Sequence, residues 1–139
     1  MKKQVICISV LVVLMSIALS GCQETKSTTT KLSSQNVYLQ STLVQFANVS
    51  LEKTKNKSGD INAVKVSWLF KNIAGRTINI TIDVRFYDVK NTLLYNETRW
   101  FNNFLKGWTE HSVTPANTVT ISGAKAALVD HVVIGVTET

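Results

Sequence analysis

The feature that most constrains the fold of this chain is the alternation of apolar residues with other residues in two runs, 64–70 and 78–86. One apolar face comprises Val64, Val66, Trp68 and Phe70, and a second comprises Ile78, Ile80, Ile82, Val84 and Phe86. β-Branched and aromatic residues at a period of two predict two half-buried strands. Gly75 lies between them and can adopt the positive φ of a tight turn. The pattern therefore predicts a central β-hairpin.

Shorter strand patterns occur on both sides of this pair. On the N-terminal side, either residues 37–46 form one broken strand or a short lead-in precedes a strand over 44–53. The C-terminal strands cover 109–114, 118–121 and 132–136. A charged loop is expected at residues 53–60, a break at 115–117 and one helical turn at 123–127. About seven short strands with turns every 8 to 12 residues or so predict an all-β fold, an immunoglobulin-like antiparallel β-sandwich.

The first 22 residues form a separate unit. Lys2 and Lys3 precede an apolar run over residues 5–19, which is shorter than a comfortable membrane span and has the layout of a secretory signal. Its ending, Leu19-Ser20-Gly21-Cys22, resembles the lipobox of prokaryotic lipoproteins. The resemblance implies acylation of Cys22, cleavage before it, and an anchored chain on the extracytoplasmic face of the cell membrane. The alternatives are an ordinary signal peptide with a chance cysteine and an uncleaved anchor.

Three segments follow from these patterns: a lipoprotein signal peptide at residues 1–21, a lipidated cysteine and polar tether at 22–36, and the sandwich at 37–139. The tether is rich in Ser and Thr and has no apolar periodicity, which is typical of a flexible linker. An N-terminal strand extension is the alternative for this segment.

Residues 66–94 resemble the FxLYD domain, a small immunoglobulin-like module of prokaryotic surface proteins and lipoproteins. The resemblance lies in Asn72 and Gly75, in Val84-Arg85-Phe86-Tyr87-Asp88, and in Asn91 with Leu93-Leu94. Val84 and Phe86 stand where the motif has Phe and Leu. It implies a strand that runs into a turn opened by Asp88, whose carboxylate accepts from backbone amides two residues on. No functional residue carries over from the family.

Charge and cysteine content exclude several classes of function. The formal net charge of +6 falls to +4 once Lys2 and Lys3 leave with the signal, and the remaining cations are scattered, so we expect no nucleic-acid binding. The two cysteines are Cys7 in the signal and Cys22, so the folded domain has no disulfide, thiolate metal site or cysteine nucleophile. We expect no cofactor and no metal.

Two histidines lie beside acids, His111 after Glu110 and His131 after Asp130. Each pair could imitate part of a catalytic relay, but the chain lacks a GxSxG-like nucleophile turn, and the two histidines have no metal-ligand spacing. We therefore expect strand-edge or turn roles for both histidines and no enzymatic activity.

The segment from residue 95 to 108 is unusually aromatic for a sandwich. Its candidate binding residues are Tyr95, Arg99, Trp100, Phe101, Phe104 and Trp108. Trp100, Phe104 and Trp108 have helical spacing, and Gly107 could end such a turn. Aromatic side chains flanked by amides and cations suit a sugar ring, a protein hot spot or a lipid headgroup boundary. The alternative is a connection between sheets whose aromatics fill the end of the core.

The expected function is a non-catalytic binding or scaffolding module in the cell envelope, with the membrane as one partner through Cys22 and an envelope protein or glycan as another. A purely structural component is the main alternative, and a glycan-binding or hydrolytic surface protein is another. Exposure of Trp100, Phe101 and Trp108 would favour the binding role. Among four glycosylation-type sequons, Asn56 in the charged loop is the best placed acceptor.

Overall fold

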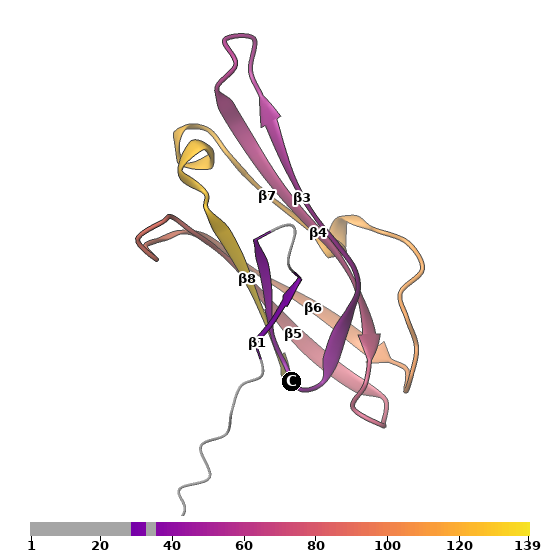
Figure 1. Ribbon diagram of the computed structural model, residues 1–139. Coiled ribbons are helices and arrows are strands. Elements are labelled where there is room, and N and C mark those ends of the chain that lie inside the picture. The colour runs from indigo at the N-terminus through magenta and orange to yellow at the C-terminus, as the bar shows by residue number, and fades with distance from the viewer. Residues whose placement is uncertain (1–28, 33–35) are drawn as a thin grey trace, which may run out of the picture.

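The computed structural model describes residues 29–32 and 36–139, so the signal segment and Cys22 lie outside the described residues (Figure 1). The chain folds into two packed β-sheets. One has five strands in the order β1-β2-β8-β5-β6, and the other has three in the order β3-β4-β7. The elements are β1 (Thr29–Leu32), β2 (Val37–Gln40), β3 (Val44–Lys55), β4 (Ile61–Asn72), β5 (Ile78–Tyr87), β6 (Leu93–Phe104), η2 (Pro115–Asn117), β7 (Thr118–Ser122), η3 (Ala124–Leu128) and β8 (His131–Glu138).

The predicted immunoglobulin-like sandwich of about seven strands is confirmed at the level of two packed sheets. The strands from β2 to β8 form sheets of four and three, and β1 adds an edge strand beside β2. β1 falls in the segment assigned to the tether, where it corresponds to the alternative of an N-terminal strand extension. One pairing departs from the antiparallel expectation, because β2 and β8 run parallel.

The alternating patterns form the core, as predicted. The inward residues of β4 and β5 are all buried, and the inward residues of β8 join them. The largest fully buried side chains include Trp68, Phe70, Phe86 and Phe104. Burying a large apolar side chain contributes about 1.5 to 3 kcal/mol, so these residues supply much of the driving force for folding.

The predicted hairpin between the two long strands is wrong. β4 pairs with β3 and β7, whereas β5 pairs with β6 and β8, so the two strands belong to opposite sheets. The turn at Gly75, where φ is +76°, carries the chain from one sheet to the other. Each strand then buries its apolar face against the opposite sheet, which satisfies the same alternation without pairing β4 to β5.

The turns follow local side-chain chemistry. Asp88 opens the β5–β6 turn as predicted, and its Oδ1 accepts hydrogen bonds from the backbone N–H groups of Lys90 and Thr92 at 2.8 Å each. These bonds hold the pKa of Asp88 below its ordinary value, the bond from Thr92 being the larger cause. The charged loop is shorter than expected, because β3 continues to Lys55 and β4 begins at Ile61.

Residues 109–114 do not form the expected strand. Their only bridge within the described chain joins Thr109 to Lys71. The backbone N–H of Asn72 donates to the Trp108 carbonyl, and that of Glu110 donates to the Phe70 carbonyl. Residues 108–110 therefore lie beside the last residues of β4, which β7 does not reach. The chain leaves β4 after this short contact and reaches the 3₁₀ turn η2 at Pro115.

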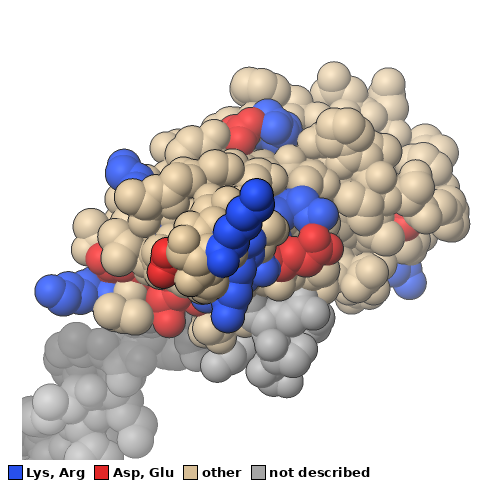
Figure 2. Space-filling view, turned by 90° about the horizontal axis from the view of Figure 1, so that it is seen from above, with Lys and Arg blue, Asp and Glu red and all other residues tan. Residues whose placement is uncertain are grey.

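The sandwich has two ends, which are named here by their loops. The hairpin end carries the projecting β3–β4 hairpin, the β5–β6 turn and η3; the C-terminal end carries the turns at residues 41–43, 73–77 and 105–108 together with Thr139 (Figure 1). Seen from above, basic and acidic side chains alternate over the hairpin end, without a field of one sign (Figure 2). Within the described chain, no helix has the length and apolar character to cross a membrane.

Candidate functional site

The aromatic segment lies on a strand and a turn rather than on a helix. Residues up to Phe104 belong to β6, which pairs with β5 along its length, and the prediction of a helical turn is therefore wrong. β6 is an edge strand of the wider sheet. The remaining aromatic, Trp108, follows a turn in which its N–H donates to the Leu105 carbonyl at 3.1 Å.

The segment divides its aromatic side chains between surface and core. Trp100, opposite Thr81 on the outer face of the sheet, is 64% exposed. Phe104 is fully buried, in agreement with the alternative that part of the segment fills the core. Phe101 is half-buried and meets Phe104 edge to face, with 5.1 Å between ring centroids. The six predicted binding residues therefore do not form one surface.

Tyr95 and Arg99 lie on the core-facing side of β6 and are joined through Glu97. They stand opposite Phe86 and Ile82, yet remain partly exposed at the edge of the sheet. The Tyr95 hydroxyl donates to Glu97 Oε2 at 3.0 Å, and Glu97 forms an ion pair with Arg99. The bond to Glu97 raises the pKa of Tyr95. Charges on the inner side of an edge strand hinder pairing with a further strand, so this trio protects the β6 edge.

Trp108 lies over the C-terminal end of the core and is 41% exposed. Its ring meets Phe104 and His111 edge to face, with centroid distances of 6.3 and 6.1 Å. A pocket of about 140 Å³ opens beside it, lined by Phe101, Trp108, Glu110, His111, Ser112, Thr114 and Asn117. This volume is below that of ordinary small-molecule sites, about 300 Å³ or more, so the pocket is a surface depression rather than a ligand site.

Glu110 is a buried carboxylate with a structural task. Its Oε2 accepts the backbone N–H of Phe70 at 2.6 Å, and its side chain also bonds to Asn117. The bonds of Glu110 thus go to Phe70 and Asn117 and not to His111, so the sequence pair Glu110-His111 does not form the first link of a relay among the described contacts. Burial raises the pKa of Glu110 and outweighs the opposing effect of these hydrogen bonds.

The raised pKa of Glu110 predicts a pH dependence of stability. Its contribution is fully present below the ordinary pKa of 4.5 and is lost as the pH rises through the higher folded-state pKa. Glu110→Gln imitates the protonated acid and does not titrate. As the pH rises from 4.5, the parent should therefore lose stability relative to this variant, and the difference between their free energies of unfolding should shift in favour of the variant. Urea unfolding of both proteins between acidic and neutral pH measures this difference. A constant difference across that range would contradict the assignment.

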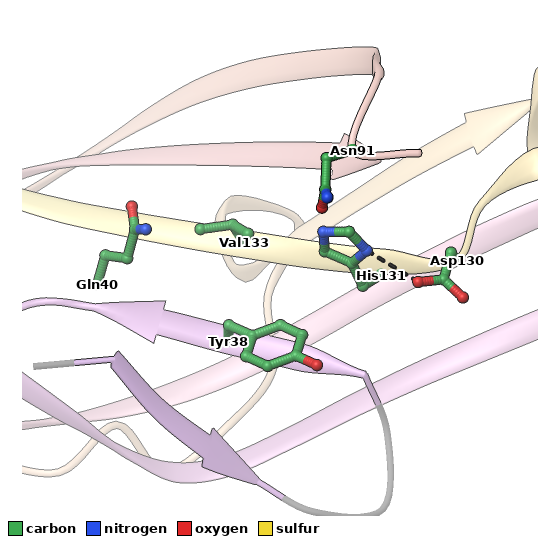
Figure 3. A pocket seen from close by; sticks show the side chains of 6 residues that line it. All are labelled: Tyr38, Gln40, Asn91, Asp130, His131 and Val133. Atoms are coloured by element: carbon green, nitrogen blue, oxygen red, sulfur yellow. Dashed lines mark hydrogen bonds and ion pairs between the residues drawn. The ribbon is translucent and has the colours of Figure 1, made fainter. Parts of the chain in front are cut away.

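A second concave site lies on the outer face of the five-stranded sheet (Figure 3). Its volume is about 380 Å³, and it is lined by Tyr38, Gln40, Asn91, Asp130, His131 and Val133. β2 and β8 contribute most of the lining, and the β5–β6 turn presents Asn91, which has a φ of +61°. Parallel pairing of β2 with β8 brings Tyr38 opposite Val133, next to His131.

His131 is held at the centre of this site. Its ring stacks on Tyr87 with 5.3 Å between centroids and meets Tyr38 edge to face at 5.7 Å. Nδ1 lies 2.9 Å from Asp130 Oδ2, an interaction drawn in Figure 3. Aromatic rings beside an amide and a carboxylate can hold a polar ring-shaped ligand. The sequence pair Asp130-His131 was the only local signal of this site, because Tyr38 and Asn91 are distant in the chain.

Arg85 covers the outer face of the sheet beside this pocket. Arg85 donates from Nη2 to Gln40 Oε1 at 2.8 Å and passes over Gly135. A Cβ at position 135 would lie 3.0 Å from Arg85 Nη2, so glycine leaves room for the arginine. The described residues contain no group of three His, Cys, Asp or Glu side chains that could hold a metal ion.

Asn56 lies at the exposed tip of the β3–β4 hairpin, where its Oδ1 accepts the Asp60 N–H at 2.9 Å. Its glycosylation remains a prediction. Comparisons of this chain with protein-family models, with curated proteins and with solved structures found no match. The FxLYD resemblance therefore remains a prediction as well.

Proposed function

We propose that this protein is a lipid-anchored component of the extracytoplasmic membrane face and that its sandwich is a non-catalytic binding module. The lipobox-like ending at Cys22 supports the anchor, and the strand that runs into the Asp88 turn supports membership of the FxLYD class. The sandwich would engage an envelope protein or glycan through its exposed outer face.

Exposure of Trp100 carries this proposal. Its indole is 64% exposed on the outer face of an edge strand, where burial would otherwise have stabilised the fold. Thr81 lies opposite it in the sheet, and the Thr81 hydroxyl is hydrogen-bonded to that of Thr139 at 2.8 Å. Tryptophan in a polar rim is the usual composition of a binding hot spot. A purely structural component would have no use for this arrangement.

The pocket at His131 favours a second candidate function, the binding of a saccharide. Its volume of about 380 Å³ accommodates a sugar ring, and Asn91 and Asp130 offer hydrogen-bonding groups beside the rings of Tyr38 and His131. This site and Trp100 lie on the same face of the five-stranded sheet but at different strands, since β6 carries Trp100 and β2 carries Tyr38.

Crosslinking and co-purification of the full-length protein from its native envelope tests both candidates. Trp100→Ala should lose a captured protein partner at least about tenfold, the effect of removing one hot-spot side chain. Tyr38→Ala is the matched variant on the same face and should retain that partner. Loss of a captured polysaccharide by Tyr38→Ala alone would favour the second candidate. Equal capture by the parent and both variants would contradict both and favour the structural role.

A further inference from the structure

Three exposed apolar side chains gather at the C-terminal end of the sandwich. Ile73 is 47% exposed, Leu105 53% and Trp108 41%. They come from two turns that are fastened together. Asn72 Nδ2 donates to the Leu105 carbonyl at 3.1 Å, and the Asn72 N–H donates to the Trp108 carbonyl at 2.9 Å. The bonds hold the two turns side by side at one end of the sandwich, and these three exposed residues are named here the apolar end cluster.

Basic side chains border this cluster. Lys71 and Lys106 are exposed; Lys106 follows Leu105 directly and Lys71 lies two residues before Ile73, while Arg76 is paired with Glu138. Apolar and indole side chains next to lysines suit the boundary between lipid headgroups and acyl chains, because the rings and stems enter the apolar layer and the ammonium groups stay with anionic headgroups. Among the partners that this composition suits, the bilayer is the one that an anchor at Cys22 would hold close to the domain.

The course of β1 relates this end to the predicted anchor. β1 is antiparallel to β2, and Thr29 pairs with Gln40, so the chain enters β1 from the side of the C-terminal end (Figure 1). Gln40 pairs in turn with Gly135, and Gly135 pairs with Asp83, so Thr29 and Asp83 lie at the same height along the strands of the sheet. Asp83 is five residue steps along β5 from Ile78 at the end of the strand, a distance of about 16 Å.

The length of chain outside the structure then limits how the domain can face the membrane. Seven residue steps join Cys22 to Thr29, and a fully extended chain spans at most about 25 Å over that number. This reach exceeds the distance of about 16 Å to the C-terminal end. The β3–β4 hairpin projects from the opposite end (Figure 1). The direction in which the chain enters β1 and the projection of the hairpin on the opposite side together favour the C-terminal end, with its apolar end cluster, as the end that a lipid at Cys22 would bring to the bilayer surface.

We infer that Ile73, Leu105 and Trp108 lie in the headgroup region of the membrane that holds Cys22, with Lys71 and Lys106 against anionic lipids. This inference rests on the proposed anchorage at Cys22. The contact would fix the orientation of the domain, because tethering raises the local concentration of the lipid surface to the point where a weak patch is occupied. The hairpin would then point away from the membrane, and the outer face with Trp100 and the His131 pocket would stay open to the envelope.

Quenching of tryptophan fluorescence by brominated lipids tests the inference. The full-length lipidated protein is reconstituted into phosphatidylcholine and phosphatidylglycerol vesicles with and without bromine on the acyl chains. Trp68 is buried in the core and serves as a constant background. Trp100→Phe, which keeps Trp108, should retain quenching, whereas Trp108→Phe should reduce it about twofold or more, because only the indole at the interface meets the bromine.

Flotation of the same vesicles separates the two possible failures. Protein that does not float with the vesicles overturns the anchorage and this inference with it. If the protein floats and the Trp108→Phe variant is quenched as strongly as the parent, the anchorage stands and only this inference is overturned. The double variant Ile73→Ser and Leu105→Ser changes only exposed side chains, so it should fold, float and show weaker quenching of Trp108. Unchanged quenching in that variant would also overturn the inference.

Discussion

Replacing Asn72 with alanine is expected to lower the free energy of unfolding by about 3 kcal/mol, because the substitution leaves buried backbone groups without partners. Asn72 is buried and makes four side-chain hydrogen bonds. The two hydrogens of Nδ2 are shared among the carbonyls of Arg76, Phe104 and Leu105 at 2.9, 2.8 and 3.1 Å, and Oδ1 accepts the Ala74 N–H at 2.9 Å. Alanine would remove all four bonds at once.

Two variants serve as controls for Asn72. Asn72→Asp keeps the shape but directs a carboxylate oxygen at three carbonyls, so it should destabilise at least as much as alanine. Asn102→Ala changes an exposed amide on β6 and should stay within about 0.5 kcal/mol of the parent. Urea unfolding followed by fluorescence measures all three. An Asn72→Ala midpoint equal to that of the parent would mean that the four bonds contribute no net stability.

The position of Asn72 connects the fold to the proposed membrane contact. It ends β4, and its side chain ties the β4–β5 turn to the turn after β6. Ile73 lies in the first of these turns and Leu105 in the second. Loss of the side chain should therefore loosen the apolar end cluster as well as the fold, which is why the quenching test uses substitutions of the cluster itself.

Local sequence patterns predicted the elements of the fold that depend on neighbours in the chain. Alternation from Val64 to Phe70 and from Ile78 to Phe86 marked two strands and their buried faces, and all of these inward residues are in the core. Asp88 and Gly75 marked turns, because one supplies a hydrogen-bond acceptor and the other tolerates positive φ. Each of these features is decided within a few residues.

Strand pairing could not be predicted in the same way. The period of two says which face of a strand is buried but not which strand lies beside it. β4 and β5 follow one another in the chain yet join opposite sheets, and β2 pairs in parallel with β8 across most of the sequence. The His131 pocket depends on this parallel pairing, so only its Asp130-His131 pair was visible in the sequence.

The aromatic segment was misassigned because its spacing is ambiguous. Positions 100, 104 and 108 fit one face of a helix, but even separations also fit one face of a strand. A β-bulge then separates them. Ile80 pairs with Phe101 and Ile78 with Phe104, so β6 has one more residue than β5 there, and Asn103 takes a φ of +55°. The extra residue turns Phe104 inward while Trp100 stays outward.

This division of the segment predicts effects of very different size on stability for two aromatic residues on one strand. Phe104→Ala removes a fully buried ring and should lower the free energy of unfolding by about 3 to 5 kcal/mol, the usual effect of opening a cavity of that size in a core. Trp100→Ala removes a larger but exposed side chain and should change it by less than about 0.5 kcal/mol. The same urea titration reports both, since Trp68 remains in each protein as a core probe. Comparable losses in the two variants would show that Trp100 is packed in solution, and the binding role of the outer face would lose its support.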